Sequence, residues 1–259
     1  MKWYENAVMY HIYPLGFCGA PKHNEGGEPV NRLEKVLDWI PHLKELGVDA
    51  VYFGPVFESV EHGYDTTDYR VIDRRLGTNE MFAHICDELH KNGIRVILDG
   101  VFSHTGADSI YFNKFGRYNT PGAYQSENSP YYSWYHFWGN KEYESWWGID
   151  TLPNVDENNP SYTKYICGDD GVLDYWMSLG AAGYRLDVAD ELPDEFLDNL
   201  RTCVKKYDEE KIVIGEVWED ASNKEAYGVK RRYLLGDQLD SVMNYPCLLY
   251  TSPSPRDIS

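Results

Sequence analysis

The chain has 259 residues, of which 42% are hydrophobic and 25% are charged, as in ordinary soluble globular proteins. Its formal net charge of −18 argues against nucleic acid or a membrane surface as a partner, because both require basic patches. No run approaches the roughly 18 apolar residues that span a bilayer, and we therefore expect a protein acting on neutral substrates.

The first part of the chain alternates strand-like and helix-like patterns. Apolar residues recur at helical spacing from Leu33 to Leu46, and a glycine follows each of the two helical segments. The run at 94–99 is almost entirely apolar, which is typical of a strand buried on both faces. We predict strands at residues 7–13, 48–53 and 94–99 and helices at residues 32–46 and 79–92.

The alternation stops after His104 and resumes near residue 161. The intervening segment is rich in Tyr, Trp, Asn, Ser, Gly and Pro and has no sustained period. A connection of this length is typical of an inserted domain. We predict an inserted domain at 105–160, between a first part of the main domain at 1–104 and a second part at 161–246.

The alternating pattern then continues towards the C-terminus. Repeated β–α units imply a parallel sheet, and six such strands predict an α/β fold, a (β/α)₈ TIM barrel with about six of its eight strands. The predicted helices are residues 162–179 and 194–206, and the predicted strands are residues 183–187, 212–216 and 239–245.

Residues 247–259 lack a helical pattern where the next helix should begin. Their sequence resembles the read-through translation of an adapter used in DNA sequencing libraries. We interpret this segment as a non-native tail, with a genuine Pro/Ser-rich tail as the alternative.

The five cysteines are odd in number and scattered, with neither metal-ligand spacing nor a disulfide framework. The first five residues lead directly into a strand pattern and do not resemble a signal peptide. We therefore predict reduced thiols and a cytoplasmic location.

Polar residues gather at the C-terminal ends of the predicted strands. Asp187 ends one apolar run and Glu216 ends the next, while Asp99 ends the third strand. In a barrel of this kind these strand ends form the active-site face. Two carboxylates held a few ångströms apart are the machinery of glycoside hydrolysis.

Five ordered segments resemble motifs of the α-amylase family, glycoside hydrolase family 13. Residues 99–104, 183–191 and 214–218 are similar to its first three signature regions, and His62-Gly63-Tyr64-Asp65 and Leu152–Asp156 are similar to two further motifs. The resemblance extends from Tyr10 to Pro246 and is strongest to the neopullulanase, cyclomaltodextrinase and α-glucosidase branches.

The resemblance implies that Asp187 is the nucleophile and Glu216 the general acid and base of a retaining mechanism. Arg185 lies two residues before Asp187 on the same strand face, so we expect its charge to lower the pKa of Asp187. For Glu216 we expect a raised pKa, because apolar residues follow it.

Substrate binding is the implied role of Tyr64, Asp65, Asp99, His104 and Arg185. Tyr64 would stack on the sugar, while Asp65, Asp99 and His104 would bond its hydroxyls. Asp99 has an alternative role as a buried partner of Arg185.

Two departures from the family pattern qualify this interpretation. Many members have an Asn ligand for calcium where this chain has Ser103, a poorer ligand for a hard cation. We therefore predict no metal and no cofactor, with calcium as the alternative. The family's third carboxylate, in a His-Asp pair at the seventh strand, has no counterpart here, which leads to the hypothesis that this polypeptide is an inactive, aggregation-prone fragment.

The predicted function is retaining hydrolysis of α-glucosidic bonds in starch-derived oligosaccharides. An α-glucan transglycosylase or isomerase would use the same residues. A non-catalytic amylase-like barrel, as in the ectodomain of amino-acid transporter heavy chains, is the alternative from another class. An α-glucan is the expected partner, with no nucleic acid and no membrane.

Overall fold

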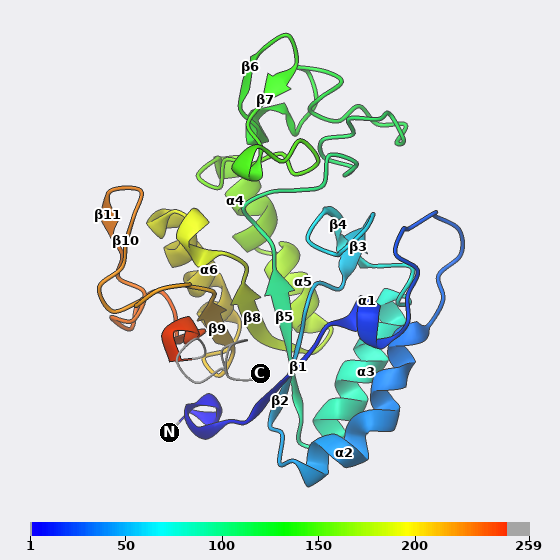
Figure 1. Cartoon of the computed structure of the whole chain (residues 1–259), viewed down its shortest axis with the longest axis vertical. Coiled ribbons are helices and arrows are strands. Elements are labelled where there is room, and N and C mark those ends of the chain that lie inside the picture. The colour runs from blue at the N-terminus through cyan, green and yellow to red at the C-terminus, as the bar shows by residue number, and fades with distance from the viewer. Residues whose placement is uncertain (1, 248–259) are drawn as a thin grey trace, which may run out of the picture.

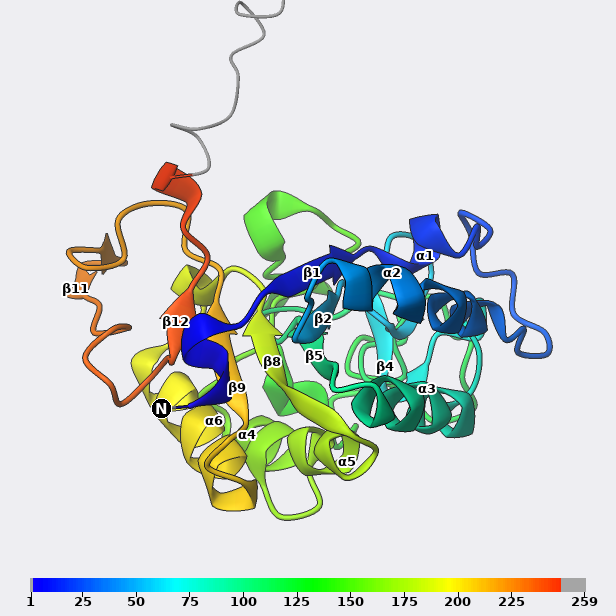
Figure 2. The same ribbon diagram turned by 90° about the horizontal axis from the view of Figure 1, so that it is seen from below.

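The computed structural model describes residues 2–247, and its centre is a sheet of six parallel strands. The strands run in the order β1-β2-β5-β8-β9-β12 and curl into a half-barrel, which confirms the predicted incomplete (β/α)₈ fold (Figures 1 and 2). All six predicted strands are present, most of them shorter than predicted. Their bounds are Met9–Ile12 (β1), Ala50–Phe53 (β2), Arg95–Gly100 (β5), Ala181–Leu186 (β8), Ile212–Gly215 (β9) and Ser241–Val242 (β12).

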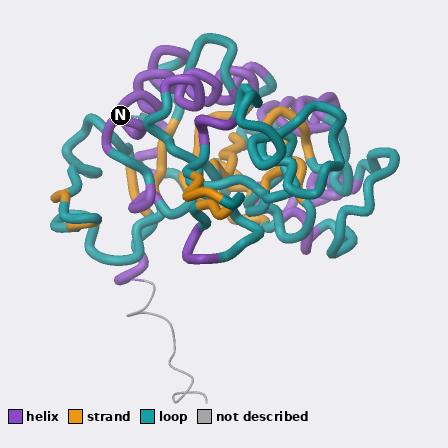
Figure 3. The backbone as a smooth tube through the Cα atoms, turned by 90° about the horizontal axis from the view of Figure 1, so that it is seen from above, coloured by secondary structure: helices purple, strands orange, loops and turns teal. Residues whose placement is uncertain are grey.

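Helices cover the outer face of the curled sheet (Figures 2 and 3). Helices α3, α5 and α6 contact strands β5, β8 and β9 respectively, and a large apolar core fills the layer between helices and sheet. A smaller cluster around Tyr52, Ile97 and Ile214 fills the concave side. The α-helices are Pro14–Phe17 (α1), Ile40–Glu45 (α2), Asn79–Lys91 (α3), Pro160–Cys167 (α4), Val172–Ser178 (α5) and Asp194–Tyr207 (α6).

Two predicted helices differ from the observed ones. Residues 32–46 form a 3₁₀ helix, η2 (Arg32–Trp39), followed by α2, because Pro41 has no N–H to continue an α-helical ladder. Residues 162–179 divide into α4 and α5. A Cβ on Gly168 would lie 2.4 Å from the carbonyl oxygen of Lys164, so the chain breaks at a close backbone contact that only glycine permits.

The sequence patterns did not predict the short antiparallel hairpins. The first, β3 (Phe57–Ser59) with β4 (Thr66–Ile72), carries the Tyr64 loop, and β6 (Phe137–Gly139) pairs with β7 (Glu142–Tyr143) in the segment predicted as an inserted domain. A third hairpin, β10 (Glu225–Ala226) with β11 (Val229–Lys230), follows β9. The remaining 3₁₀ turns are η1 (Trp3–Asn6), η3 (Tyr132–Trp134), η4 (Trp146–Gly148) and η5 (Ala189–Glu191).

The segment from 105 to 160 rises beyond the C-terminal ends of the strands, above β5 (Figure 1). Its division from the main domain at those residues stays a prediction. The predicted non-native tail lies outside the described residues, apart from Cys247. Within residues 2–247, no helix has the length and apolar character needed to cross a bilayer.

Gly183 allows β8 and β9 to approach each other closely. Its φ is +148°, and a Cβ at this position would lie 2.0 Å from the carbonyl oxygen of Ile212 on β9. The same strands carry Arg185, paired with Ile214, and Leu186, paired with Gly215. The pairing of Gly183 with Ile212 therefore fixes the register of β8 and β9 and so the relative positions of their C-terminal ends.

We expect Gly183→Ala to lower the free energy of unfolding by about 3 kcal/mol, through a disfavoured φ and a clash with the neighbouring backbone. Gly93→Ala is the matched control, because Gly93 also has a positive φ (+78°) but nothing within 4 Å of an added Cβ. The control should lose about 1 kcal/mol. Urea unfolding followed by circular dichroism measures both, and equal losses would contradict the role of the strand contact.

Candidate active site

One buried guanidinium lies at the centre of the site and contacts three carboxylates. Arg185 Nη1 lies 2.8 Å from Asp99 Oδ1 and 3.0 Å from Asp187 Oδ1. Its Nη2 lies 2.7 Å from Glu216 Oε2. The predicted pair, Asp187 and Glu216, therefore meets at two nitrogens of the same guanidinium, and all four side chains are buried.

Asp99 faces inward and has no exposed surface. Its Oδ2 accepts hydrogen bonds from the hydroxyls of Tyr52, at 2.6 Å, and Tyr64, at 3.4 Å. With Arg185 on its other oxygen, Asp99 adopts the arrangement described by the alternative interpretation, a buried partner of the guanidinium. Tyr52 belongs to this cluster although the motifs did not identify it.

Glu216 is held by donors from three segments. Its Oε2 accepts the backbone N–H of Val188 at 2.9 Å in addition to Arg185, and its Oε1 accepts the Tyr245 hydroxyl at 2.7 Å. The donor at Val188 belongs to a residue with φ 37° and ψ 67°, in the left-handed region. The sequence analysis assigned no role to Val188, whose backbone N–H acts here, or to Tyr245, which lies outside the five motifs.

The protonation of the two acids differs from the expectation. Burial, followed by the charge of Asp99, raises the pKa of Asp187 to about 7 against the opposing effect of Arg185. Burial also acts to raise the pKa of Glu216, but the charge of Arg185 and the bonds from Tyr245 and Val188 outweigh it and hold this pKa below its ordinary value. The expected order of the two pKa values is therefore wrong for this arrangement, because one guanidinium serves three carboxylates.

His104 is buried with both ring nitrogens hydrogen-bonded. Nε2 lies 3.0 Å from the Tyr64 carbonyl oxygen, which can only accept, so Nε2 carries the proton. Nδ1 then accepts from the Ser103 hydroxyl at 3.0 Å. Burial lowers the pKa of His104 to about 4, so the ring is neutral at pH 7 and fixes the Tyr64 loop beside Asp99.

Asp65 lies in the same loop but faces its backbone. Its Oδ2 accepts the N–H groups of Val60 at 3.1 Å and Glu61 at 2.8 Å, and its Oδ1 accepts that of Gly63 at 3.2 Å. This arrangement shapes the turn that presents Tyr64. A substrate contact for Asp65 stays a prediction.

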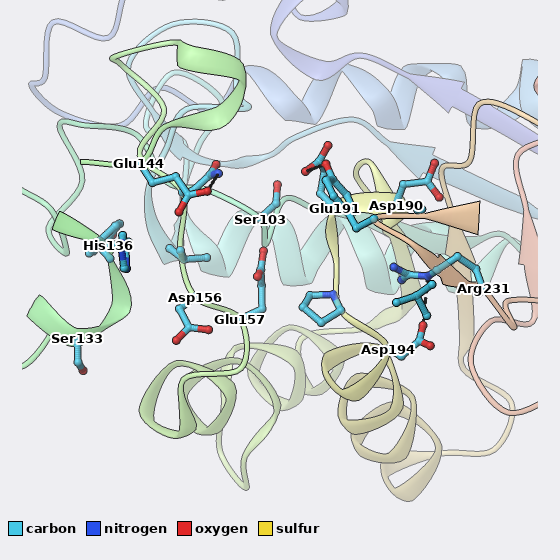
Figure 4. A pocket seen from close by; sticks show the side chains of 17 residues that line it. Ser103, Ser133, His136, Glu144, Asp156, Glu157, Asp190, Glu191, Asp194 and Arg231 are labelled. Atoms are coloured by element: carbon cyan, nitrogen blue, oxygen red, sulfur yellow. Dashed lines mark hydrogen bonds and ion pairs between the residues drawn. The ribbon is translucent and has the colours of Figure 1, made fainter. Parts of the chain in front are cut away.

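A cavity of about 560 Å³ lies between the 105–160 segment and the elements after β8 and β9 (Figure 4). Among its lining residues, Glu157 is 9% exposed and burial raises its pKa well above the ordinary value. Glu191 joins both walls, accepting from Trp147 Nε1 at 3.4 Å and from the Tyr227 hydroxyl at 2.6 Å. Figure 4 labels the polar lining residues Ser103, Ser133, His136, Glu144, Asp156, Glu157, Asp190, Glu191, Asp194 and Arg231.

The residues that could hold calcium do not form a fitting ligand set. The Ser103 hydroxyl is bonded to His104, and among residues 2–247 no group of three His, Cys, Asp or Glu side chains could hold a metal ion. The expectation of a metal-free protein stays a prediction.

Comparison with protein families gives a match over most of the chain. Residues 11–254 match the family described as "Alpha amylase, catalytic domain". The chain is 33% identical to neopullulanase 2 of Thermoactinomyces vulgaris over 272 residues, covering 94% of this chain and 43% of that protein. It is 34% identical to the cyclomaltodextrinase of Thermoanaerobacter pseudethanolicus over 270 residues, covering 95% and 43%. The chain therefore spans less than half the length of either relative.

A solved structure has the same fold. The cyclic alpha-maltosyl-(1→6)-maltose hydrolase of Arthrobacter globiformis superposes with a TM-score of 0.77 at 28% identity. The match covers 94% of this chain and 56% of that protein.

Asp187→Asn should make the protein more stable at alkaline pH. An unfolded Asp titrates near 3.9, whereas the folded pKa is about 7, so the folded state binds the extra proton between these values. Raising the pH from 4 to 7 therefore lowers the free energy of unfolding, and at pH 8 removing the charge should stabilise by roughly 1–3 kcal/mol. Urea unfolding at pH 5 and pH 8 measures the effect. The exposed Asp38→Asn is the control, and an equal pH slope in both variants would contradict the assignment.

Removing divalent cations should leave the melting temperature unchanged within about 1 °C, because the Ser103 hydroxyl is already bonded and no fitting ligand set surrounds it. Thermal unfolding with excess EDTA, then with excess calcium, tests this. A rise of several degrees with calcium would show that a site exists.

Proposed function

Because the chain belongs to the α-amylase catalytic-domain family, we propose that it carries the central machinery of a retaining glycosidase acting on α-glucosidic bonds. The family membership confirms the resemblance seen in the sequence. The observation that carries the proposal is the meeting of Asp187 and Glu216 at one guanidinium, on neighbouring strand ends. Neighbouring parallel strands lie about 4.8 Å apart, close to the roughly 5–5.5 Å between carboxyls in retaining glycosidases.

In the proposed reaction, the carboxylate of Asp187 attacks the anomeric carbon while Glu216 donates its proton to the departing oxygen. The glycosidic carbon–oxygen bond breaks and an ester to Asp187 forms. Glu216, now a carboxylate, takes a proton from water, whose oxygen attacks the same carbon and releases Asp187. Two inversions at one carbon give net retention.

The protonation of the two acids fits the second step of this reaction, in which Glu216 must be a carboxylate. Because the pKa of Asp187 is about 7 and that of Glu216 lies below its ordinary value, a proton bound by this pair resides on Asp187 and not on Glu216. The first step needs it on Glu216. Arg185 contacts both carboxyls. A movement of its guanidinium towards Asp187 would lower the pKa of Asp187 and raise that of Glu216, which favours the protonation that the first step needs.

The substrate class rests on the relatives' names and on the aromatic residues near the site. Trp147 is 66% exposed, stacks on Trp146 at 5.0 Å and meets Trp218 edge-on at 5.8 Å. Such rings offer flat apolar faces to sugar rings. We propose an α-glucan oligosaccharide substrate, with Tyr64, Arg185, Asp99, His104 and Asp65 shaping the subsite at the cleaved bond.

Asp187→Asn and Glu216→Gln should each lower kcat/KM on a maltooligosaccharide or cyclomaltodextrin by about 1,000-fold or more. Proton NMR of the first product should show the α anomer, as retention requires. The assay is run on this chain and on any longer protein that contains it, because the chain spans less than half the length of these relatives. Asp38→Asn is the control, and a non-catalytic protein would show equal rates in all three variants.

A further inference from the structure

Tyr245 reaches Glu216 from a segment that the proposed mechanism does not use. It follows β12, where the Met243 N–H donates to the Gly215 carbonyl at 2.9 Å and so continues the pairing beyond the strand. Arg185 Nε also lies 3.4 Å from the Met243 sulfur. These contacts place the Tyr245 ring, which is half-buried, beside the end of β9.

The direction of the bond between Tyr245 and Glu216 follows from charge. Burial, followed by the bond and charge of Glu216, raises the pKa of Tyr245 to about 12, so its hydroxyl keeps its proton at working pH. The Glu216 carboxyl is ionised against Arg185, so the hydroxyl donates and the carboxylate accepts, at 2.7 Å. The Trp218 side chain also hydrogen-bonds Glu216, and the Tyr245 hydroxyl also bonds the Arg185 side chain, so Tyr245 contacts both members of the ion pair.

We propose that Tyr245 is a positioning residue for the acid/base carboxyl, fixing the orientation of Glu216 and favouring its charged form through this hydrogen bond. The inference rests on the function proposed above. It assigns Tyr245 to the step in which Glu216 must be a carboxylate, the activation of water. Without the hydroxyl, Glu216 would keep its proton to higher pH, and its Oε1 would lose the donor that fixes this oxygen.

The other groups that face Glu216 remain in place when the hydroxyl is removed. They come from separate elements and would hold the carboxyl in the same surroundings: Arg185 and Asp187 at β8, Asp99 on β5, Tyr64 in the β3–β4 loop, Trp218 after β9 and the Val188 N–H. A change in the titration of Glu216 in Tyr245→Phe can therefore be assigned to the lost hydroxyl, which bonds Glu216 and Arg185.

The direct test is the titration of Glu216 in this chain, which requires no turnover. Carboxyl ¹³C NMR of glutamate-labelled protein follows it, with the resonance assigned through Glu216→Gln. We expect Tyr245→Phe to move the midpoint upward by about one pH unit, since a hydrogen bond to a charged group is worth that much. Tyr207→Phe, on the end of α6, should leave it unchanged. Tyr245→Leu should shift it in the same direction and serves if the first variant folds poorly.

In a catalytically active form of the protein, Tyr245→Phe should move the acidic limb of the kcat/KM profile upward by a similar amount, because Glu216 has the lower of the two pKa values. It should lower kcat about tenfold, with KM within twofold. An unchanged Glu216 midpoint in both Tyr245 variants would overturn the inference. A shifted midpoint together with no hydrolysis in any form of the wild type would instead overturn the proposed function, so the two failures are distinguishable.

Discussion

The site depends on an excess of negative charge: three carboxylates surround the single guanidinium of Arg185. In water such a cluster would separate, but here the strand ends of β5, β8 and β9 hold it together in a buried space. Because burial penalises every charge, the site cannot keep all three acids ionised, and Asp187 holds its proton to about pH 7. Because of this excess negative charge, each hydroxyl or N–H that donates to one of the carboxylates influences which of them keeps a proton. Tyr52 on Asp99 and Tyr245 on Glu216 are therefore part of the electrostatics of the site as well as its packing.

The sequence allowed the barrel and the identity of the central acids to be predicted, for physical reasons that are local. An apolar run such as 212–215 is stable when it is buried as a strand in the centre of the fold. A carboxylate directly after it, such as Glu216, then lies at the C-terminal end of the strand, on the active-site face. Where a helix contained a hidden interruption, prediction was wrong, because Pro41 and Gly168 act through a single missing N–H and a single close carbonyl. Neither changes the apolar period that suggested a continuous helix.

Pairwise energetics could not be predicted in the same way. Arg185 stands two residues from Asp187, which predicted their contact, and Asp99 was an alternative partner of Arg185. The sequence could not show that Asp99 and Asp187 share one guanidinium nitrogen while Glu216 takes the other. The order of the two pKa values depends on that sharing. Likewise, Asp65 and His104 carry the residue types of sugar-binding groups, while their polar atoms are engaged by the loop itself. Such details depend on distances between segments far apart in the chain.

Val188 carries a further consequence. A β-branched residue with φ 37° is rare, and the conformation costs on the order of 1–3 kcal/mol unless its surroundings impose it. Here the twist aims the Val188 N–H at Glu216, and the next N–H, of Ala189, donates to the Glu216 carbonyl at 2.9 Å. Two consecutive N–H groups of the loop that follows Asp187 thus bind the side chain and the backbone carbonyl of Glu216. A displacement of that loop would therefore change the positions of Asp187 and Glu216 together, which couples the two reacting groups.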